Sequence, residues 1–83
     1  MKVKTFKAQY ELIEFDHYMD HSYEEPISVI DLLLKTNEID YVKDELETLF
    51  AVETDKQSYV FSGYTVNECY EIEDGLVKVV CIK

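Results

Sequence analysis

The chain has 83 residues and a formal net charge of −10, with 18 acidic residues, eight lysines and no arginine. This length allows one domain, residues 1–83, and an apolar content of 47% is too high for a disordered acidic tail. The negative field disfavours direct binding to nucleic acid or anionic lipid, and it attracts cations and basic protein surfaces.

The charges are segregated along the chain. Residues 8–77 contain all 18 acidic residues and three lysines, which gives this segment a net charge of −15. No apolar run has the length of a signal peptide or of a membrane span, so we expect a cytoplasmic protein. Lys, Ile, Tyr and Phe are used in place of Arg and Trp, a composition typical of AT-rich coding sequence from a bacterium or its phage.

The first predicted element is a strand from Val3 to Phe15, because apolar and polar residues alternate there. Residues 16–25, DHYMDHSYEE, break the alternation and predict a surface loop.

A helix is predicted over Ile27–Lys35, because Pro26 suits a first helical position and Ser28 with Asp31 offers a cap. Apolar residues on nearly every side of this helix mean that it lies inside the core or is covered by a second subunit. The β-branched residues at its start leave a strand open as the alternative.

A second helix is predicted over Thr36–Phe50, with Asn37 as its N-cap. Apolar residues recur there at three- and four-residue steps and form one stripe that must be buried. The outer face is acidic and carries Glu38, Asp40, Asp44, Glu45 and Glu47.

Two hairpins are predicted in the last third of the chain. One joins Ser58–Phe61 to Tyr64–Glu73 through a Ser62-Gly63 turn, and the other turns at Asp74-Gly75, a strong type I′ signal. The expected register gives a core face that carries Tyr59, Phe61, Tyr64, Val66, Tyr70, Ile72, Val77, Val79 and Cys81.

The same register pairs Glu71 with Lys78 on the opposite face. It also places Cys69 and Cys81 on opposite faces of the sheet, so no disulfide is expected. The predicted fold is therefore α+β with the order β-α-α-β-β-β, an antiparallel or mixed sheet with two helices packed on one face. Lysines on the first and last strands predict that these strands are the sheet edges.

The motif DHYMDH offers the candidate metal ligands His17 and His21, with Asp16 and Asp20 beside them. No further ligand completes a recognised zinc pattern, so a polar loop is the favoured interpretation. Both glycines occupy predicted turns, and no pair of carboxylates stands out for acid–base catalysis. We expect no enzyme activity, no catalytic residue and no cofactor.

The acidic surface is the remaining feature. Carboxylates four apart on a helix, or two apart on a strand, repeat at about 6 Å, a spacing similar to that of phosphates along a nucleic-acid strand. We therefore hypothesise a small non-enzymatic inhibitor that mimics DNA or RNA and binds a basic protein surface, such as that of a nuclease or other nucleic-acid enzyme. Its partner-binding residues would be Asp16, Tyr18, Asp20, Tyr23, Glu24, Glu25, Asp40, Tyr41, Asp44, Glu45 and Glu47.

In size, composition and charge the chain resembles the small acidic proteins that phages and mobile elements use against host restriction and CRISPR nucleases. The likeness is one of type, without a shared motif. The competing interpretation is an acidic surface that serves only solubility. The sequence is also compatible with a homodimeric regulatory domain without mimicry and with Ile27–Leu34 at its interface, with an acidic antitoxin, and with a metal-binding protein that uses His17 and His21.

Overall fold

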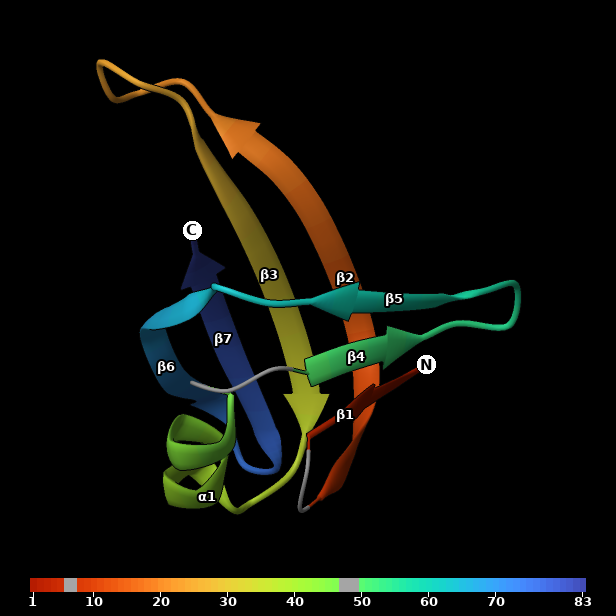
Figure 1. Ribbon diagram of the computed structural model, residues 1–83. Coiled ribbons are helices and arrows are strands. Elements are labelled where there is room, and N and C mark those ends of the chain that lie inside the picture. The colour runs from red at the N-terminus through yellow and green to blue at the C-terminus, as the bar shows by residue number, and fades with distance from the viewer. Residues whose placement is uncertain (6–7, 47–49) are drawn as a thin grey trace.

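The computed structural model describes residues 1–5, 8–46 and 50–83, and there the chain is mostly β, with 61% strand and 9% helix. Seven strands form one open antiparallel sheet in the order β5-β4-β1-β2-β3-β7-β6 (Figure 1). The strands are β1 (Lys2–Lys4), β2 (Gln9–Asp20), β3 (Ile27–Lys35), β4 (Phe50–Glu53), β5 (Ser58–Phe61), β6 (Thr65–Glu73) and β7 (Leu76–Ile82). Within the described residues, the one helix is α1 (Ile39–Glu45).

The predicted α+β fold with two helices is wrong, chiefly because Ile27–Lys35 is the strand β3. β3 pairs with β2 on one side and β7 on the other. Ile30, Leu32 and Leu34 are fully buried on the core face, and residues between them are partly covered on the other face. A strand that is covered on both faces has a continuous run of apolar residues in its sequence. Over a short segment, such a run cannot be distinguished from that of a buried helix.

The acidic helix exists but is shorter than predicted. α1 begins at Ile39 with Glu38 at the N-cap, without a side-chain cap from Asn37, and Phe50 already belongs to β4. Of the predicted apolar stripe, Val42 and the C-cap residue Leu46 are fully buried and Ile39 is partly buried, so its first part is confirmed. Residues 47–49, at the end of the predicted helix, lie outside the described residues.

The predicted strand Val3–Phe15 is two strands. β1 pairs antiparallel with the start of β2, and β2 runs on to Asp20, past the end predicted for it. Residues 16–20 are therefore strand and not loop; the turn between β2 and β3 covers residues 21–26. Within β2 the register shifts at Ile13, a β-bulge that the alternating pattern does not reveal.

The hairpin at Asp74-Gly75 is confirmed, with Glu73 opposite Leu76. The predicted type I′ turn is wrong, because it needs a positive φ at both central residues and only Gly75 has one, at +82°. A register shift between Glu71 and Glu73 then changes the pairing, so Lys78 lies opposite Tyr70 and not Glu71.

This shift also moves the cysteines. Cys69 pairs with Val79, which shares its face with Cys81, so the prediction of opposite faces is wrong; both thiols are free. Val77, Val79 and Cys81 are buried as predicted, whereas the bulge leaves Tyr70 and Ile72 exposed.

The hairpin through Ser62-Gly63 is wrong. β5 pairs with β4, and the chain then crosses from one edge of the sheet to β6 at the other. The edges are thus β5 and β6, and the strands that carry the terminal lysines, β1 and β7, lie inside the sheet.

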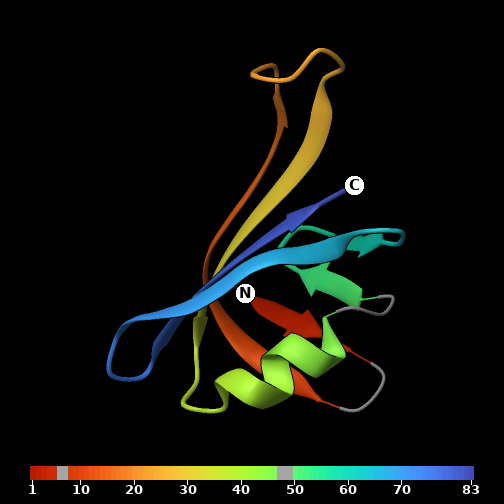
Figure 2. The same ribbon diagram turned by 90° about the vertical axis from the view of Figure 1, so that its left-hand side faces the viewer.

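The sheet is strongly curved. Phe15 of β2 and Phe61 of β5 have ring centroids 5.9 Å apart, although β1 and β4 separate their strands in the sheet order. The core inside the curve is formed by Val3, Tyr10, Leu12, Ile30, Leu32, Leu34, Val42, Leu46, Val52, Phe61, Tyr64, Val77, Val79 and Cys81. Figure 2 shows the far end of the β2–β3 hairpin rising above the rest of the molecule, with α1 at the opposite end. Among the described residues, no helix is long and apolar enough to cross a bilayer.

Candidate functional site

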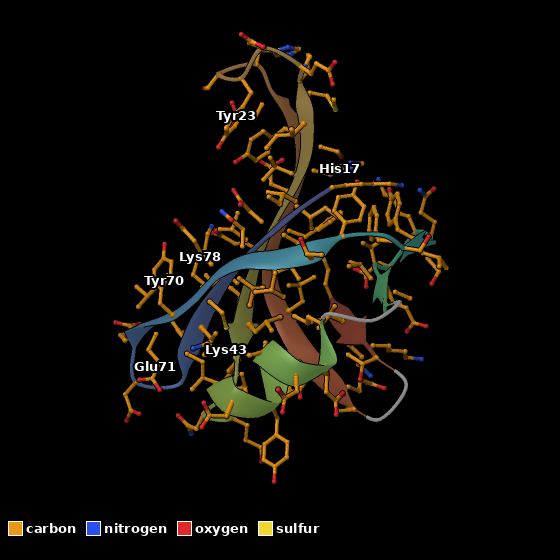
Figure 3. All side chains as sticks on the ribbon, turned by 60° about the vertical axis from the view of Figure 1, so that its left-hand side comes forward. His17, Tyr23, Lys43, Tyr70, Glu71 and Lys78 are labelled. Carbon is orange, nitrogen blue, oxygen red and sulfur yellow. The ribbon has the colours of Figure 1, made fainter. Side chains whose placement is uncertain are left out.

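The far half of the β2–β3 hairpin, residues 16–31, forms an arm whose end projects from the molecule and whose base, Val29 to Asp31, also pairs with β7. It holds Asp16, Tyr18 and Asp20 on β2, and the turn at its end holds the other predicted contacts of this group, Tyr23, Glu24 and Glu25. All of these residues are exposed except Asp20, which is half-exposed. Figure 3 shows Tyr23 near the end of the arm and His17 nearer its base. The structure thus gathers the predicted residues 16–25 on one projecting element.

Strand pairing separates the arm into two faces. Asp16 lies opposite Asp31 and Tyr18 opposite Val29, whereas His17 lies opposite Ile30, which is fully buried in the core. Residues directly opposite in an antiparallel pair share a face. The outer face of the arm therefore carries Glu14, Asp16, Tyr18 and Asp20 of β2 with Asp31 of β3, and His17 points to the inner side.

The outer face is a site of like-charge repulsion. Asp16 and Asp31 face each other directly, which is destabilising in a sheet. Together with Glu14 they line an open hollow of about 420 Å³, whose walls are Met1, Ile13, Glu14, Phe15, Asp16, Asp31 and Lys78. None of these three carboxylates has an ion-pair partner among the described residues. The hollow is open to solvent, and with three carboxylates and one lysine, Lys78, in its walls it has a negative net charge.

Two groups on the arm have shifted pKa values. The backbone N–H of Ser22 donates a hydrogen bond to Asp20 Oδ1 at 2.9 Å, and hydrogen bonding from Ser22 lowers the pKa of the Asp20 carboxyl. Desolvation, and then the charge and hydrogen bond of Asp31, raise the pKa of Tyr18. At neutral pH, Asp20 is thus held as an anion and Tyr18 as a neutral donor.

The acidic residues of α1 form a separate group. Asp40, Tyr41 and Asp44 are exposed, with Tyr41 at 63%, but they lie at the end of the molecule opposite the arm (Figure 1). Glu45 is half-buried and accepts a hydrogen bond from the Thr5 hydroxyl. Glu47 lies outside the described residues. The predicted partner-binding residues therefore occupy at least two surfaces and do not form one band.

The candidate metal ligands are not brought together. His17 is on the inner side of the arm, away from Asp16 and Asp20, and His21 is in the turn. Over residues 1–5, 8–46 and 50–83, no three His, Cys, Asp or Glu side chains cluster closely enough to hold a metal ion.

His17 instead belongs to a polar cluster that sequence reasoning missed. Its Nε2 lies 3.0 Å from Ser28 Oγ and 3.2 Å from the Tyr64 hydroxyl, and these two hydroxyls are 2.6 Å apart. The His17 ring also meets Phe61 edge-on at 5.4 Å. Strict alternation from Tyr10 and Leu12 would have placed His17 on the outer face. The bulge at Ile13 turns it inward, and its partners come from distant parts of the chain.

This cluster joins the base of the arm to the loop that follows β5. A serine hydroxyl beside an imidazole resembles a nucleophile with its base, but catalysis also needs a group that orients the imidazole. The carboxylates nearest in sequence, Asp16 and Asp20, lie on the outer face. The cluster fastens the base of the arm to Tyr64. The backbone N–H of Lys83 donates to Ser28 O at 3.1 Å and fastens it to residue 83.

Comparison with protein families, with curated proteins and with solved structures found no match to this chain.

Proposed function

We propose that this protein is a small non-enzymatic inhibitor that occupies a basic, nucleic-acid-binding surface of another protein and mimics the nucleic acid there. The observation that supports this proposal is the outer face of the arm. It displays Glu14, Asp16 and Asp20 along one strand, with Asp31 beside Asp16 on the next.

The spacing of these carboxylates suits the proposed partner. Side chains two apart on one face of a strand repeat every 6.6 Å or so, and Glu14 to Asp20 span roughly 20 Å. Lysine or arginine side chains that contact successive phosphates could therefore reach successive carboxylates of this row. Tyr18 and Tyr23, both exposed on the arm, add apolar contact area next to the charges.

Repulsion within the free protein favours binding of a cation. The carboxylates of Asp16 and Asp31 oppose each other, and among the described residues neither forms an ion pair, although Lys78 lines the same hollow. A basic side chain of the partner, placed in the adjoining hollow, would attract both carboxylates and so offset the repulsion between them. Association should consequently be fast at low ionic strength and weaken as salt is added.

The test compares two charge reversals of equal size. Asp16→Lys with Asp20→Lys changes the arm, and Asp40→Lys with Asp44→Lys changes α1; each pair of substitutions makes the net charge more positive by the same amount. Tagged wild-type protein is first incubated with bacterial lysate, and we expect it to retain a nucleic-acid enzyme that is released by high salt and displaced by DNA. Affinities of all three proteins for the enzyme are then measured by titration calorimetry.

We expect the arm variant to bind the enzyme roughly 30-fold more weakly, since each exposed ion pair contributes up to about 1 kcal/mol and two are reversed. The α1 variant should lose only the smaller share that follows from net charge. Equal losses in both variants would show that the arm has no special role. Captured proteins that DNA does not displace would argue against mimicry.

A further inference from the structure

Within residues 1–5, 8–46 and 50–83, β5 is an edge strand whose outer side pairs with no other strand. It pairs with β4, and the sheet ends beyond it. The backbone N–H of Thr54 donates to Gln57 O at 3.0 Å and closes the β4–β5 hairpin. From this bond onwards, hydrogen-bonded and non-hydrogen-bonded residue pairs alternate along β4 and β5. The backbone groups of Tyr59 therefore form hydrogen bonds to β4, and the backbone N–H and C=O groups of Ser58 and Val60 point away from the sheet.

This edge is short, at four residues, but it lacks the charges, the proline and the bulge that commonly protect an edge strand. Residues 57–67 carry no charge, in a chain with 31% charged residues. Val60 is 68% exposed, and the pairing of β5 with β4 contains no bulge. The other edge, β6, has two register shifts and three glutamates, Glu68, Glu71 and Glu73, which discourage pairing.

We propose that the β5 edge binds the β5 edge of a second copy of this chain in antiparallel orientation, around a two-fold axis at Val60. Val60 then faces Val60 of the second copy and exchanges two N–H···O=C bonds with it, and Ser58 faces Ser62. Tyr59 lies beside Phe61 of the second copy on the inner face. The outward backbone groups of Ser58 and Val60 fit this register. A residue on the two-fold axis can hydrogen-bond to the same residue of the second copy only if its own N–H and C=O groups point away from its own sheet.

The charge distribution favours a second copy as the occupant. Two molecules that each carry −10 repel one another, and repulsion is least where their uncharged edges meet. A basic partner has no charge to bind at this edge and is drawn to the arm. The contact is also preorganised, because ring contacts of Phe15 with Tyr59 at 5.8 Å and with Phe61 at 5.9 Å fix the inner side of β5.

This inference is independent of the proposed inhibitor function, and salt separates the two. Screening weakens repulsion between like-charged copies, so added salt should tighten the dimer. The same salt should weaken the binding of a basic partner to the arm. Reversing the charge of Asp16 and Asp20 should impair partner binding and leave the dimer intact.

The test is sedimentation equilibrium of the full chain at about 0.05 M and 0.5 M NaCl, where the Debye length falls several-fold. We expect the wild type to approach twice the chain mass of 9.8 kDa, more completely at high salt. Val60→Lys should weaken the dimer at least tenfold, because two lysines meet at the axis. Ile72→Lys, the same change at a 55% exposed residue of the β6 edge, is the matched control and should behave like the wild type.

Cross-linking provides a second readout that does not depend on affinity. Residues opposite each other in a hydrogen-bonded antiparallel pair have Cα atoms about 5.5 Å apart, which a disulfide can bridge. Mild oxidation should therefore link two copies of Val60→Cys and leave Ile72→Cys as single chains.

Three results would overturn the proposal. One is a wild type that stays a single chain at both salt concentrations. Another is a dimer that dissociates in Ile72→Lys and persists in Val60→Lys. The third is mild oxidation that links two copies of Ile72→Cys and leaves Val60→Cys as single chains.

Discussion

The strand character of residues 27–35 can be tested with two neighbouring leucines. Leu32 is fully buried on the core face of β3, between Phe15 of β2 and Val79 of β7. Leu33 points to the outer face, opposite Glu14 and Lys78, and is half-buried. In the apolar helix predicted from sequence, both leucines would be enclosed and their truncations would cost similar amounts.

In the β structure the two truncations should differ. Leu32→Ala leaves a cavity among fully buried neighbours and should lower the free energy of unfolding by about 3 kcal/mol. A domain of this size has a total stability of roughly 4–12 kcal/mol, so this loss is a large part of it. Each kcal/mol lowers the midpoint of thermal unfolding by about 4–8 °C, so the midpoint should fall by about 12–24 °C. Leu33→Ala removes a side chain that water already reaches, and should cost about 1 kcal/mol.

Urea unfolding followed by circular dichroism measures both values, and an unchanged slope with denaturant would show that the unfolding transition itself is preserved. Equal losses for the two variants, or a larger loss for Leu33→Ala, would refute the placement of β3 in the sheet.

Two further predictions concern the β6–β7 hairpin and its strands. Gly75 has φ +82°, and a Cβ there would meet only Asn37 Oδ1, at 3.8 Å; Gly75→Ala should therefore lower the free energy of unfolding in urea by about 1–2 kcal/mol through backbone strain, and Gly75→Asn by less. Burial raises the pKa of the Cys81 thiol from its ordinary value of 9.0 to about 12. Because the unfolded chain loses this proton first, stability should fall as pH rises from about 9 towards 12, by up to about 1.4 kcal/mol per pH unit, and the fall should be smaller in Cys81→Ala.

The features that sequence predicted correctly depend on short-range physics. The stripe of Val42 and Leu46 repeats at helical spacing, and α1 forms there. Asp74-Gly75 forms its turn because Gly75 supplies a positive φ that other residues resist.

The errors arose where long-range pairing decides the outcome. Ile27–Lys35 becomes a strand because β2 and β7 flank it, and nothing within the segment itself reveals those neighbours. The bulge at Ile72 shifts the register of β6 by one residue, which turns Cys69 inward and Tyr70 outward.

The candidate site shows the same division. The acidic residues between Asp16 and Glu25 were identified from composition alone, since charge needs no fold to be counted. Their arrangement could not be predicted, because Asp31 joins Asp16 only through the β2–β3 register, and Asp40 is carried to the far end of the molecule. His17 was assigned to the metal candidates, but the fold turns it towards Ser28 and Tyr64.

The two proposed surfaces divide one acidic protein into parts with opposite electrostatic behaviour. The arm concentrates carboxylates where a cation can reach them, and β5 presents backbone groups without any charge. Binding at the arm should decline with salt, whereas pairing at β5 should increase. An acidic surface that served only solubility would bind no basic partner, whether or not β5 forms a dimer. A salt titration of mass and of partner affinity on one preparation therefore tests the two surfaces separately.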